Sequence, residues 1–333
     1  MRVALVGAGK IASEEHLPAW RGIDGASLTW VVDRDARRAR TVAEQWGIPA
    51  WTTDLSQAVA AGTVDAVDIC TSAFTHVELV RAALRLGVHV LVEKPLAESA
   101  DAAQALCDAA RAARCVLMVA ENWPYSSAFR RVQDIVARGS LGTLHGVAVI
   151  HRSGLRRGPA RPDHGVLGHT FIAGSHAVHL LRLLMGPVSQ VVGYWQGPRE
   201  RGAEGMVLDA AAEILFSFDS GAMGSMHISA LGWETGPRQL FMRLEGSRGQ
   251  VEFDVLAGWV RVTTADGSLT EAPRATSMGY REELEAFCAA VASRDEVMLA
   301  DEAYVDTLRT VEAIYRSFSE RAPQAPARGR ALG

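Results

Sequence analysis

Short apolar runs alternate with segments of helical periodicity through the first 120 residues of the chain. The apolar runs are bounded by charged or glycine-rich positions, and we expect them to form buried strands at residues 3–6, 28–32, 64–70, 88–92 and 116–120. The helical segments begin near residue 9 and continue at 35–46, 75–86 and 99–114. Strands spaced by helices of this length predict βαβ units and a parallel sheet.

In the second half of the chain, strand-like segments follow one another with few helices between them. We expect strands at 145–151, 188–195, 210–218, 222–229, 239–245, 250–255 and 259–263, and helices at 127–138, 174–185, 281–294 and 301–320. Turn signals such as Asp219-Ser220-Gly221 favour antiparallel pairing. The whole pattern predicts an α/β protein with domains at 1–122 and 123–321 and a loose tail at 322–333.

The first expected strand leads into Gly7-Ala8-Gly9-Lys10-Ile11-Ala12, which fits the dinucleotide-binding pattern G-x-G-x-x-A between a strand and a helix. Gly7 permits a tight turn, Gly9 lets a pyrophosphate approach the backbone, and the small Ala12 allows close packing of helix on strand. Free amide N–H groups at the start of the helix would bind the phosphates. We therefore take this loop, with Lys10 and Ile11, as a candidate cofactor site; a glycine-rich turn without a nucleotide is the alternative.

The second expected strand ends at Asp33, about twenty residues beyond the glycine loop. A carboxylate at this place accepts hydrogen bonds from both ribose hydroxyls, which favours NAD. Arg34 follows directly, and an arginine there would bind the 2′-phosphate of NADP. The sequence therefore predicts NAD and leaves NADP open.

The third and fourth expected strands deliver polar residues to one edge of the sheet, because parallel strands bind ligands beyond their carboxyl ends. Thr71, Ser72 and His76 follow the third strand, and we expect them near the nicotinamide half of the cofactor; a plain first-turn position is the alternative for His76. Glu93-Lys94-Pro95 ends the fourth strand, where a lysine reaches a substrate oxygen as an acid or base. A charged strand end in water is the alternative.

Composition limits the kinds of partner. The chain has 333 residues and a formal net charge of -4, and it shows no basic run, so nucleic acid is disfavoured as a ligand. No apolar stretch approaches the ~20 residues of a membrane span. The four cysteines include no CxxC pair, which is typical of reduced thiols in a cytoplasmic protein. A small molecule is the expected partner.

The stretches GAGKIA, VDRDARRARTVAE, ICTSAFTHVELVRAALRLGVHVLVEKPLA and GSHAVHLLRLLMG resemble the Gfo/Idh/MocA oxidoreductases, the family of glucose-fructose oxidoreductase and inositol dehydrogenase. The resemblance extends to about Phe318. It implies an N-terminal Rossmann domain and a C-terminal α+β domain with a large, mostly antiparallel open sheet. It also implies hydride transfer between NAD or NADP and a sugar, aminosugar, cyclitol or related polyol. Members commonly form homo-oligomers through the exposed sheet face, so a dimer or tetramer is expected.

By this resemblance, Lys94 is the catalytic lysine and His176 is the histidine that acts with it. The matching cofactor positions are Gly7, Gly9, Ala12, Asp33, Ser72, His76, Glu93 and Lys94. The family's second signature, roughly D-x-x-x-H-x-x-D, is incomplete here, because Ile172 and His179 occupy its two acid positions. Three possibilities stay open: Lys94 and His176 suffice, His179 takes part, or the chemistry differs.

Two further candidates follow the fifth expected strand. Asn122 is a candidate contact of cofactor or substrate, and Tyr125 is a candidate lining residue; an interdomain linker is the alternative. The loop at 152–169 is expected to cover the substrate. His176 and His179 share a helix face, but their spacing fits no standard zinc pattern, so no metal is expected.

The sequence thus favours an NAD(P)-dependent dehydrogenase or reductase acting on CH–OH groups, with Lys94 as acid and base. One alternative is a non-catalytic sensor or regulator that binds the nucleotide, which the missing acid at Ile172 favours. Another is a reductase of a non-sugar substrate with a C=N or C=C bond.

Overall fold

The computed structural model describes residues 1–154, 168–197, 209–232, 238–265, 267, 269–271, 277–293 and 302–328. Contacts within the chain divide it into two compact units, Met1–Asn122 with Gly279–Val305, and Trp123–Met278 with Asp306–Gly333. In this division Gly279–Val305 groups with the first unit. Most of the expected cover loop at 152–169 lies outside the described residues.

The first unit contains a six-stranded parallel sheet with the order β3-β2-β1-β4-β5-β6. Its strands are β1 (Arg2–Val6), β2 (Ser27–Val32), β3 (Ala50–Thr52), β4 (Ala66–Ile69), β5 (His89–Glu93) and β6 (Leu117–Ala120). The order reverses between β1 and β4, the switch point at which such sheets bind ligands. The five predicted strands are confirmed, but β3 was not predicted, because three residues are too few to show a period.

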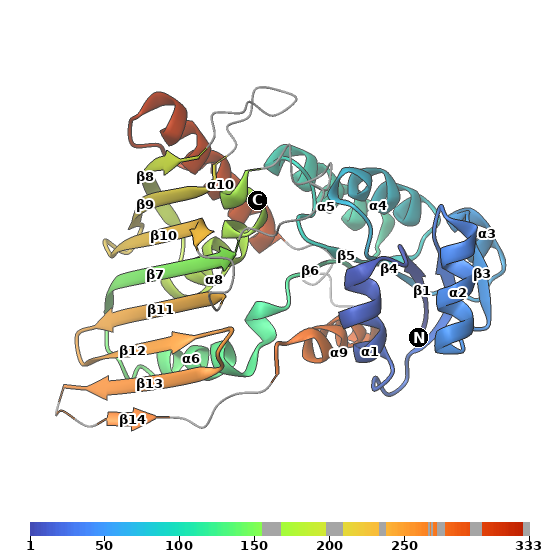
Figure 1. The fold of residues 1–333 in the computed structure, drawn as a ribbon, viewed down its shortest axis with the longest axis horizontal. Coiled ribbons are helices and arrows are strands. Elements are labelled where there is room, and N and C mark those ends of the chain that lie inside the picture. The colour runs from blue at the N-terminus through green and yellow to red at the C-terminus, as the bar shows by residue number, and fades with distance from the viewer. Residues whose placement is uncertain are drawn as a thin grey trace. The chain divides into compact units, whose positions relative to one another are not determined.

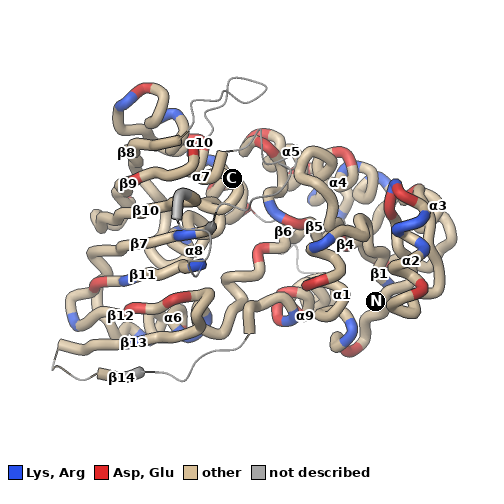
Figure 2. Tube along the Cα trace, in the orientation of Figure 1, with Lys and Arg blue, Asp and Glu red and all other residues tan. Residues whose placement is uncertain are grey.

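Eight helices belong to the first unit among the described residues, and three of them begin at a side-chain cap. They are η1 (Ala12–His16), α1 (Leu17–Trp20), α2 (Ala36–Trp46), α3 (Leu55–Ala60), η2 (Ala73–Thr75), α4 (His76–Arg85), α5 (Ala100–Ala113) and α9 (Tyr280–Ser293). The side chains of Asp35, Asp54 and Ser99 accept backbone N–H bonds at the starts of α2, α3 and α5. Charged positions of both signs occur on these helices (Figure 2).

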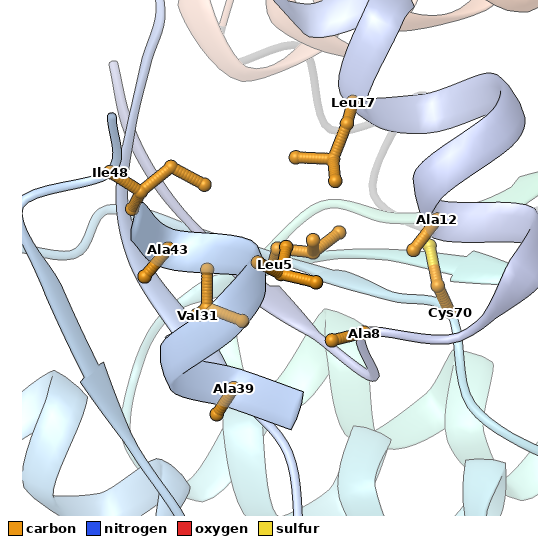
Figure 3. Packing of buried hydrophobic residues seen from close by; sticks show 10 residues of the cluster. Leu5, Ala8, Ala12, Leu17, Val31, Ala39, Ala43, Ile48 and Cys70 are labelled. Carbon is orange, nitrogen blue, oxygen red and sulfur yellow. The ribbon is translucent and has the colours of Figure 1, made fainter. Parts of the chain in front are cut away.

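A closed apolar cluster lies against the glycine loop. Leu5 of β1 and Val31 of β2 belong to it, together with Ala39 of α2 and Ala12 at the start of η1. Figure 3 shows Ala12 next to Cys70, which follows β4. The methyl group at position 12 is fully buried, so a small residue there lets the chain after the loop pack closely on the sheet.

The second unit contains an eight-stranded sheet with the order β14-β13-β12-β11-β7-β10-β9-β8. Its strands are β7 (Leu144–Gly154), β8 (Val188–Gln196), β9 (Ala211–Phe218), β10 (Met223–Gly232), β11 (Gln239–Gly246), β12 (Gly249–Asp254), β13 (Trp259–Thr264) and β14 (Leu269–Glu271). Neighbouring strands are antiparallel except β7 and β10, which are parallel. The expected large, mostly antiparallel sheet is confirmed.

Helices lie on one side of this sheet: η3 (Trp123–Tyr125), α6 (Ser127–Ala137), α7 (His169–Ile172), α8 (Gly174–Met185) and α10 (Glu302–Glu320) (Figure 1). On β9, Ile214 and Phe216 are buried whereas Leu215 between them is exposed, as expected for a sheet covered on one face. Gln324 pairs with Val191, so the tail expected to be loose is fixed at this point. None of the described helices is long and apolar enough to span a bilayer.

Candidate functional site

Gly7 forms the sharp turn at the end of β1. Its φ is +94°, a left-handed conformation that side chains rarely adopt, and its N–H donates to the Val32 carbonyl oxygen at 2.7 Å. A Cβ atom here would lie 2.7 Å from the Thr71 side chain and 2.8 Å from the Cys70 carbonyl oxygen. Only glycine therefore allows β1, β2 and the end of β4 to meet in this way.

The rest of the loop leaves room for a ligand. A Cβ atom on Gly9 would meet nothing within 4 Å, so the backbone faces open space where a pyrophosphate is expected. Lys10 is exposed and lies 3.5 Å from Glu14, while Ile11 is half-buried against the cluster that contains Ala12. The backbone of the loop thus leaves room for a dinucleotide, and the exposed Lys10 places a positive charge in the same loop.

Asp33 links the end of β2 to the glycine loop. Its carboxylate accepts the Ala8 N–H at 2.8 Å and the Asp35 N–H at 2.9 Å. A carboxylate has about four acceptor positions, so two remain for ribose hydroxyls. Arg34 is exposed, and Arg38 approaches Asp33 at 3.7 Å. An acid with spare acceptor positions fits the 2′-hydroxyl of NAD.

His76 connects the ends of β4 and β5. Its Nδ1 lies 2.8 Å from the Pro95 carbonyl oxygen and its Nε2 lies 3.3 Å from that of Thr71. Burial lowers the pKa of His76 and the charge of Lys94 acts in the same direction, whereas the two hydrogen bonds and the charge of Glu93 raise it. Ser72 precedes η2 and, like Thr71, is half-buried. His76 is therefore placed to hold the turn that carries Lys94.

Lys94 follows β5 directly and is half-buried. Its backbone N–H donates to Glu93 Oε2 at 3.1 Å, and the Lys94–Pro95 peptide bond is cis. In the sheet order, β4 alone separates β5 from β1. The lysine thus leaves the sheet at the same edge as the glycine loop, where parallel sheets bind ligands.

Buried polar residues that the sequence did not single out lie beside these groups. Asp68 is completely buried in β4, and its Oδ2 accepts from His16 Nδ1 at 2.9 Å and from Trp20 Nε1 at 2.7 Å. An acid inside an otherwise apolar strand is the signal that could have revealed them, because a buried charge requires partners.

His16, Asp68 and Cys70 each offer one possible metal-ligand atom. These three atoms all lie within 4.8 Å of one another, which is the distance range of a metal site. Burial raises the pKa of the Cys70 thiol, so it stays protonated, and its Sγ lies 3.4 Å from Asp68 Oδ1. Hydrogen bonds therefore account for this group without an ion.

In the second unit, His176 on α8 lies against aromatic rings. The Trp123 indole stacks on it with ring centroids 4.0 Å apart and an angle of 23° between the planes. The Trp123 indole also contacts the His151 ring in a T-shaped arrangement, with ring centroids 5.7 Å apart and an angle of 75° between the planes. Trp123 and His151 are further residues that the sequence did not indicate: Trp123 lies between the candidates Asn122 and Tyr125, and His151 lies in an expected strand.

The remaining residues singled out in the sequence are His179, Ile172, Asn122 and Tyr125, and they differ in burial and in contacts. His179 is buried and its Nδ1 lies 2.9 Å from the Thr307 hydroxyl on α10, a contact that favours a packing role. Ile172 ends α7, so no carboxylate precedes α8 at that position. Asn122 is buried after β6, and Tyr125 is half-buried, with the Arg130 guanidinium 5.3 Å from its ring centroid.

Both units match models of one protein family. The oxidoreductase family with an NAD-binding Rossmann fold matches residues 1–121, and the GFO/IDH/MocA C-terminal domain matches residues 129–252. The chain belongs to the GFO/IDH/MocA family. The resemblance seen in the sequence is thereby confirmed, together with the fold that it implied.

Several curated GFO/IDH/MocA relatives are dehydrogenases. D-xylose 1-dehydrogenase (NADP(+)) 2 of Haloferax volcanii is 28% identical over 95% of this chain and 97% of its own length. D-apiose dehydrogenase of Paraburkholderia graminis is 30% identical over 74% of this chain and 65% of its own length. Among solved structures, GenD2 from gentamicin A biosynthesis, in complex with NAD, is 28% identical with a TM-score of 0.83, covering 98% of this chain and 97% of its own.

Proposed function

We propose that this GFO/IDH/MocA member transfers hydride between NAD(H) and a hydroxyl or carbonyl group of a sugar, aminosugar, cyclitol or related polyol, with Lys94 as acid and base. The observation that carries the proposal is the exit of Lys94 from β5 at the edge that also holds the glycine loop and Asp33. The names of the relatives, which act on D-xylose, D-apiose and myo-inositol, support the substrate class.

The cofactor residues in this proposal are those of the first unit. The backbone from Gly7 to Ala12, with Lys10 and Ile11, holds the pyrophosphate, and Asp33 holds the adenosine ribose. Thr71, Ser72, His76, Glu93 and Asn122 complete the set near the nicotinamide. NAD is favoured over NADP because the Asp33 carboxylate would repel a 2′-phosphate; Arg34 is the residue through which NADP would be accepted.

Bound nicotinamide supplies the acceptor or donor of hydride. During oxidation, the Lys94 amine removes the proton of the substrate hydroxyl while hydride leaves the same carbon, and the carbonyl product forms; reduction reverses both transfers. For His176 we propose that it orients or protonates the reacting oxygen. His179 and Tyr125 are weaker candidates for substrate contacts.

The substitution Lys94→Ala tests the assignment. We expect kcat to fall by about 10³-fold, the size of a lost acid–base group, while the Kd for NAD stays within about threefold. Calorimetry with NAD and the absorbance of NADH over a panel of pentoses, aminosugars and inositols give both quantities. Full turnover in Lys94→Ala contradicts the role of Lys94, and NAD binding without turnover of any panel member by the unsubstituted protein favours a sensor.

We also propose a homo-oligomer, a dimer or tetramer, that forms through the open face of the second unit's sheet. Three large apolar side chains on adjacent strands of that face are exposed: Tyr194 on β8, Leu215 on β9 and Met223 on β10. Exposed apolar groups gathered in this way mark association surfaces. A molar mass measured by light scattering gives the assembly.

A cytoplasmic location is part of the proposal. Its support is the state of Cys70, Cys107, Cys115 and Cys288, which are all free thiols in the structure.

A further inference from the structure

His16 bridges two carboxylates inside the first unit. It is 1% exposed, its Nδ1 lies 2.9 Å from Asp68 Oδ2, and its Nε2 lies 3.2 Å from Glu93 Oε1. The other Glu93 oxygen, Oε2, accepts the backbone N–H of Lys94 at 3.1 Å. A continuous chain of hydrogen bonds therefore runs from β4 through the turn after the glycine loop to the backbone of the candidate catalytic lysine.

The bridge requires a charged imidazole. Ionised carboxylates only accept hydrogen bonds, and only the imidazolium has an N–H on both nitrogens. Burial by itself lowers the pKa of His16, but the charge and the hydrogen bond of Asp68, with a contribution from Cys70, raise it well above its usual value. His16 is thus a buried cation placed between two anions.

The other groups that face His16 do not replace this charge. They are Glu15 on its own turn, Trp20 on α1, Cys70 after β4, and Tyr280 and Glu283 on α9. Burial raises the pKa values of Tyr280 and Glu283, which favours their neutral forms. The Tyr280 ring centroid lies 6.1 Å from that of His16. Asp68 and Glu93 therefore remain the two anions that His16 contacts through hydrogen bonds.

We propose that His16 is a positioning residue for Lys94: it fixes the Glu93 carboxylate, and Glu93 in turn fixes the backbone and the charge surroundings of Lys94. The inference rests on the proposed acid–base role of Lys94. It gives the segment after the glycine loop a second task, because the turn that follows the phosphate-binding backbone also secures the end of β5.

Two substitutions separate the two hydrogen bonds of His16. In His16→Gln the amide nitrogen takes the place of Nε2 and keeps a donor to Glu93, whereas in His16→Asn it takes the place of Nδ1 and keeps only the Asp68 bond. We expect kcat to fall about tenfold or more in the Asn variant and about threefold or less in the Gln variant, with the Kd for NAD within about twofold in both. A purely structural role would give losses that follow the melting temperature instead of this order.

The control is His89→Gln on the same strand. His89 Nδ1 accepts the Val116 N–H at 3.0 Å at the opposite end of β5 from Lys94. This variant also removes a histidine side chain that bonds to the neighbouring chain segment at Val116. It leaves the hydrogen bond between His16 and Glu93 intact. We expect its kcat to equal that of the unsubstituted protein within about twofold. Its melting temperature should fall about as far as that of the His16 variants.

The charge of His16 gives a second, independent readout. The chain has only two lysines, Lys10 and Lys94, so reductive methylation with ¹³C-formaldehyde labels two lysine side chains and the N-terminus. Lys10→Arg assigns the Lys94 signal. Glu93→Gln removes an anion and should move the Lys94 titration midpoint to lower pH, whereas His16→Gln removes a cation and should move it to higher pH, each by about 0.5 unit or more.

Equal kcat values in the Asn and Gln variants, or titration midpoints that do not move in either the Glu93 or the His16 variant, overturn the inference. Failure of the proposed function has a different signature, since it appears as full turnover in Lys94→Ala. In that case the lysine titration still reports whether His16 and Glu93 control its charge.

Discussion

The two units hold their candidate catalytic residues by different means. Lys94 stands at the end of a chain of hydrogen bonds that joins Asp68, His16 and Glu93. His176 instead lies against the Trp123 ring, stacked at 4.0 Å. A hydrogen bond fixes the direction of a polar group, whereas stacking fixes the plane of a ring.

The two regions also differ at the acid positions of the family pattern. The family's acid positions around α8 hold Ile172 and His179, and His179 bonds to Thr307. In the first unit, by contrast, Asp68 and Glu93 are buried and paired with His16. We infer that control of the acid–base lysine depends more on the first unit than the family pattern would indicate.

Removing His176 is the largest change that tests this difference. We expect His176→Ala to lower kcat by about 10²-fold, less than Lys94→Ala, because in the proposed mechanism the histidine orients the oxygen and the lysine moves the proton. Steady-state kinetics at saturating NAD on the best panel substrate measures both. A loss as large as that of Lys94→Ala would show that the two units contribute equally. It would contradict the inference that the first unit contributes more.

Trp123 gives a smaller and more specific test of stacking. Trp123→Phe keeps a ring beside His176, so we expect kcat within about threefold, whereas Trp123→Leu removes the ring and should cost about tenfold. Both variants bury less apolar surface, so kcat is measured well below the melting temperature of each. Equal losses in the Phe and Leu variants would show that volume, and not an aromatic plane, positions His176.

The sequence predicted the architecture well; the cofactor residues stay a prediction, although the elements that carry them were found. Glycines at positions 7 and 9 and the acid at 33 are local signals, because a tight turn, a bare backbone and a strand-end carboxylate each require particular residue types. The strand that carries Lys94 ended within one residue of its predicted position. Periodicity also found α8 at its full length.

The supporting contacts were not predicted, because they join residues far apart in the chain. His16, Asp68 and Glu93 come from three different elements and meet only in the folded sheet. Likewise, nothing local indicates that Trp123 stacks on His176 or that Gly279–Val305 groups with the first unit. A sequence pattern predicts a single helix or strand from its own residues. A contact between two elements can be predicted only when their arrangement in the fold is known.

The smallest expected effect concerns the stability of the first unit. Glu283 on α9 is completely buried, and neither of its oxygens has a hydrogen-bond partner among the described residues. Burial raises the pKa of Glu283 well above its usual value, and the charge of His16 opposes this only in part. The folded protein therefore holds a proton that the unfolded chain releases above about pH 4.3, so stability falls as pH rises from there toward the folded pKa.

Glu283→Gln removes this dependence, because an amide does not ionise. We expect the variant to melt above the unsubstituted protein at pH 8 and the advantage to shrink toward pH 5, with a slope of at most about 1.4 kcal/mol per pH unit. Glu285→Gln is the control, since the exposed Glu285 pairs with Arg281 at the surface and should show no such trend. Parallel melting curves for both variants across this range would contradict the proposal that Glu283 carries a proton in the folded first unit.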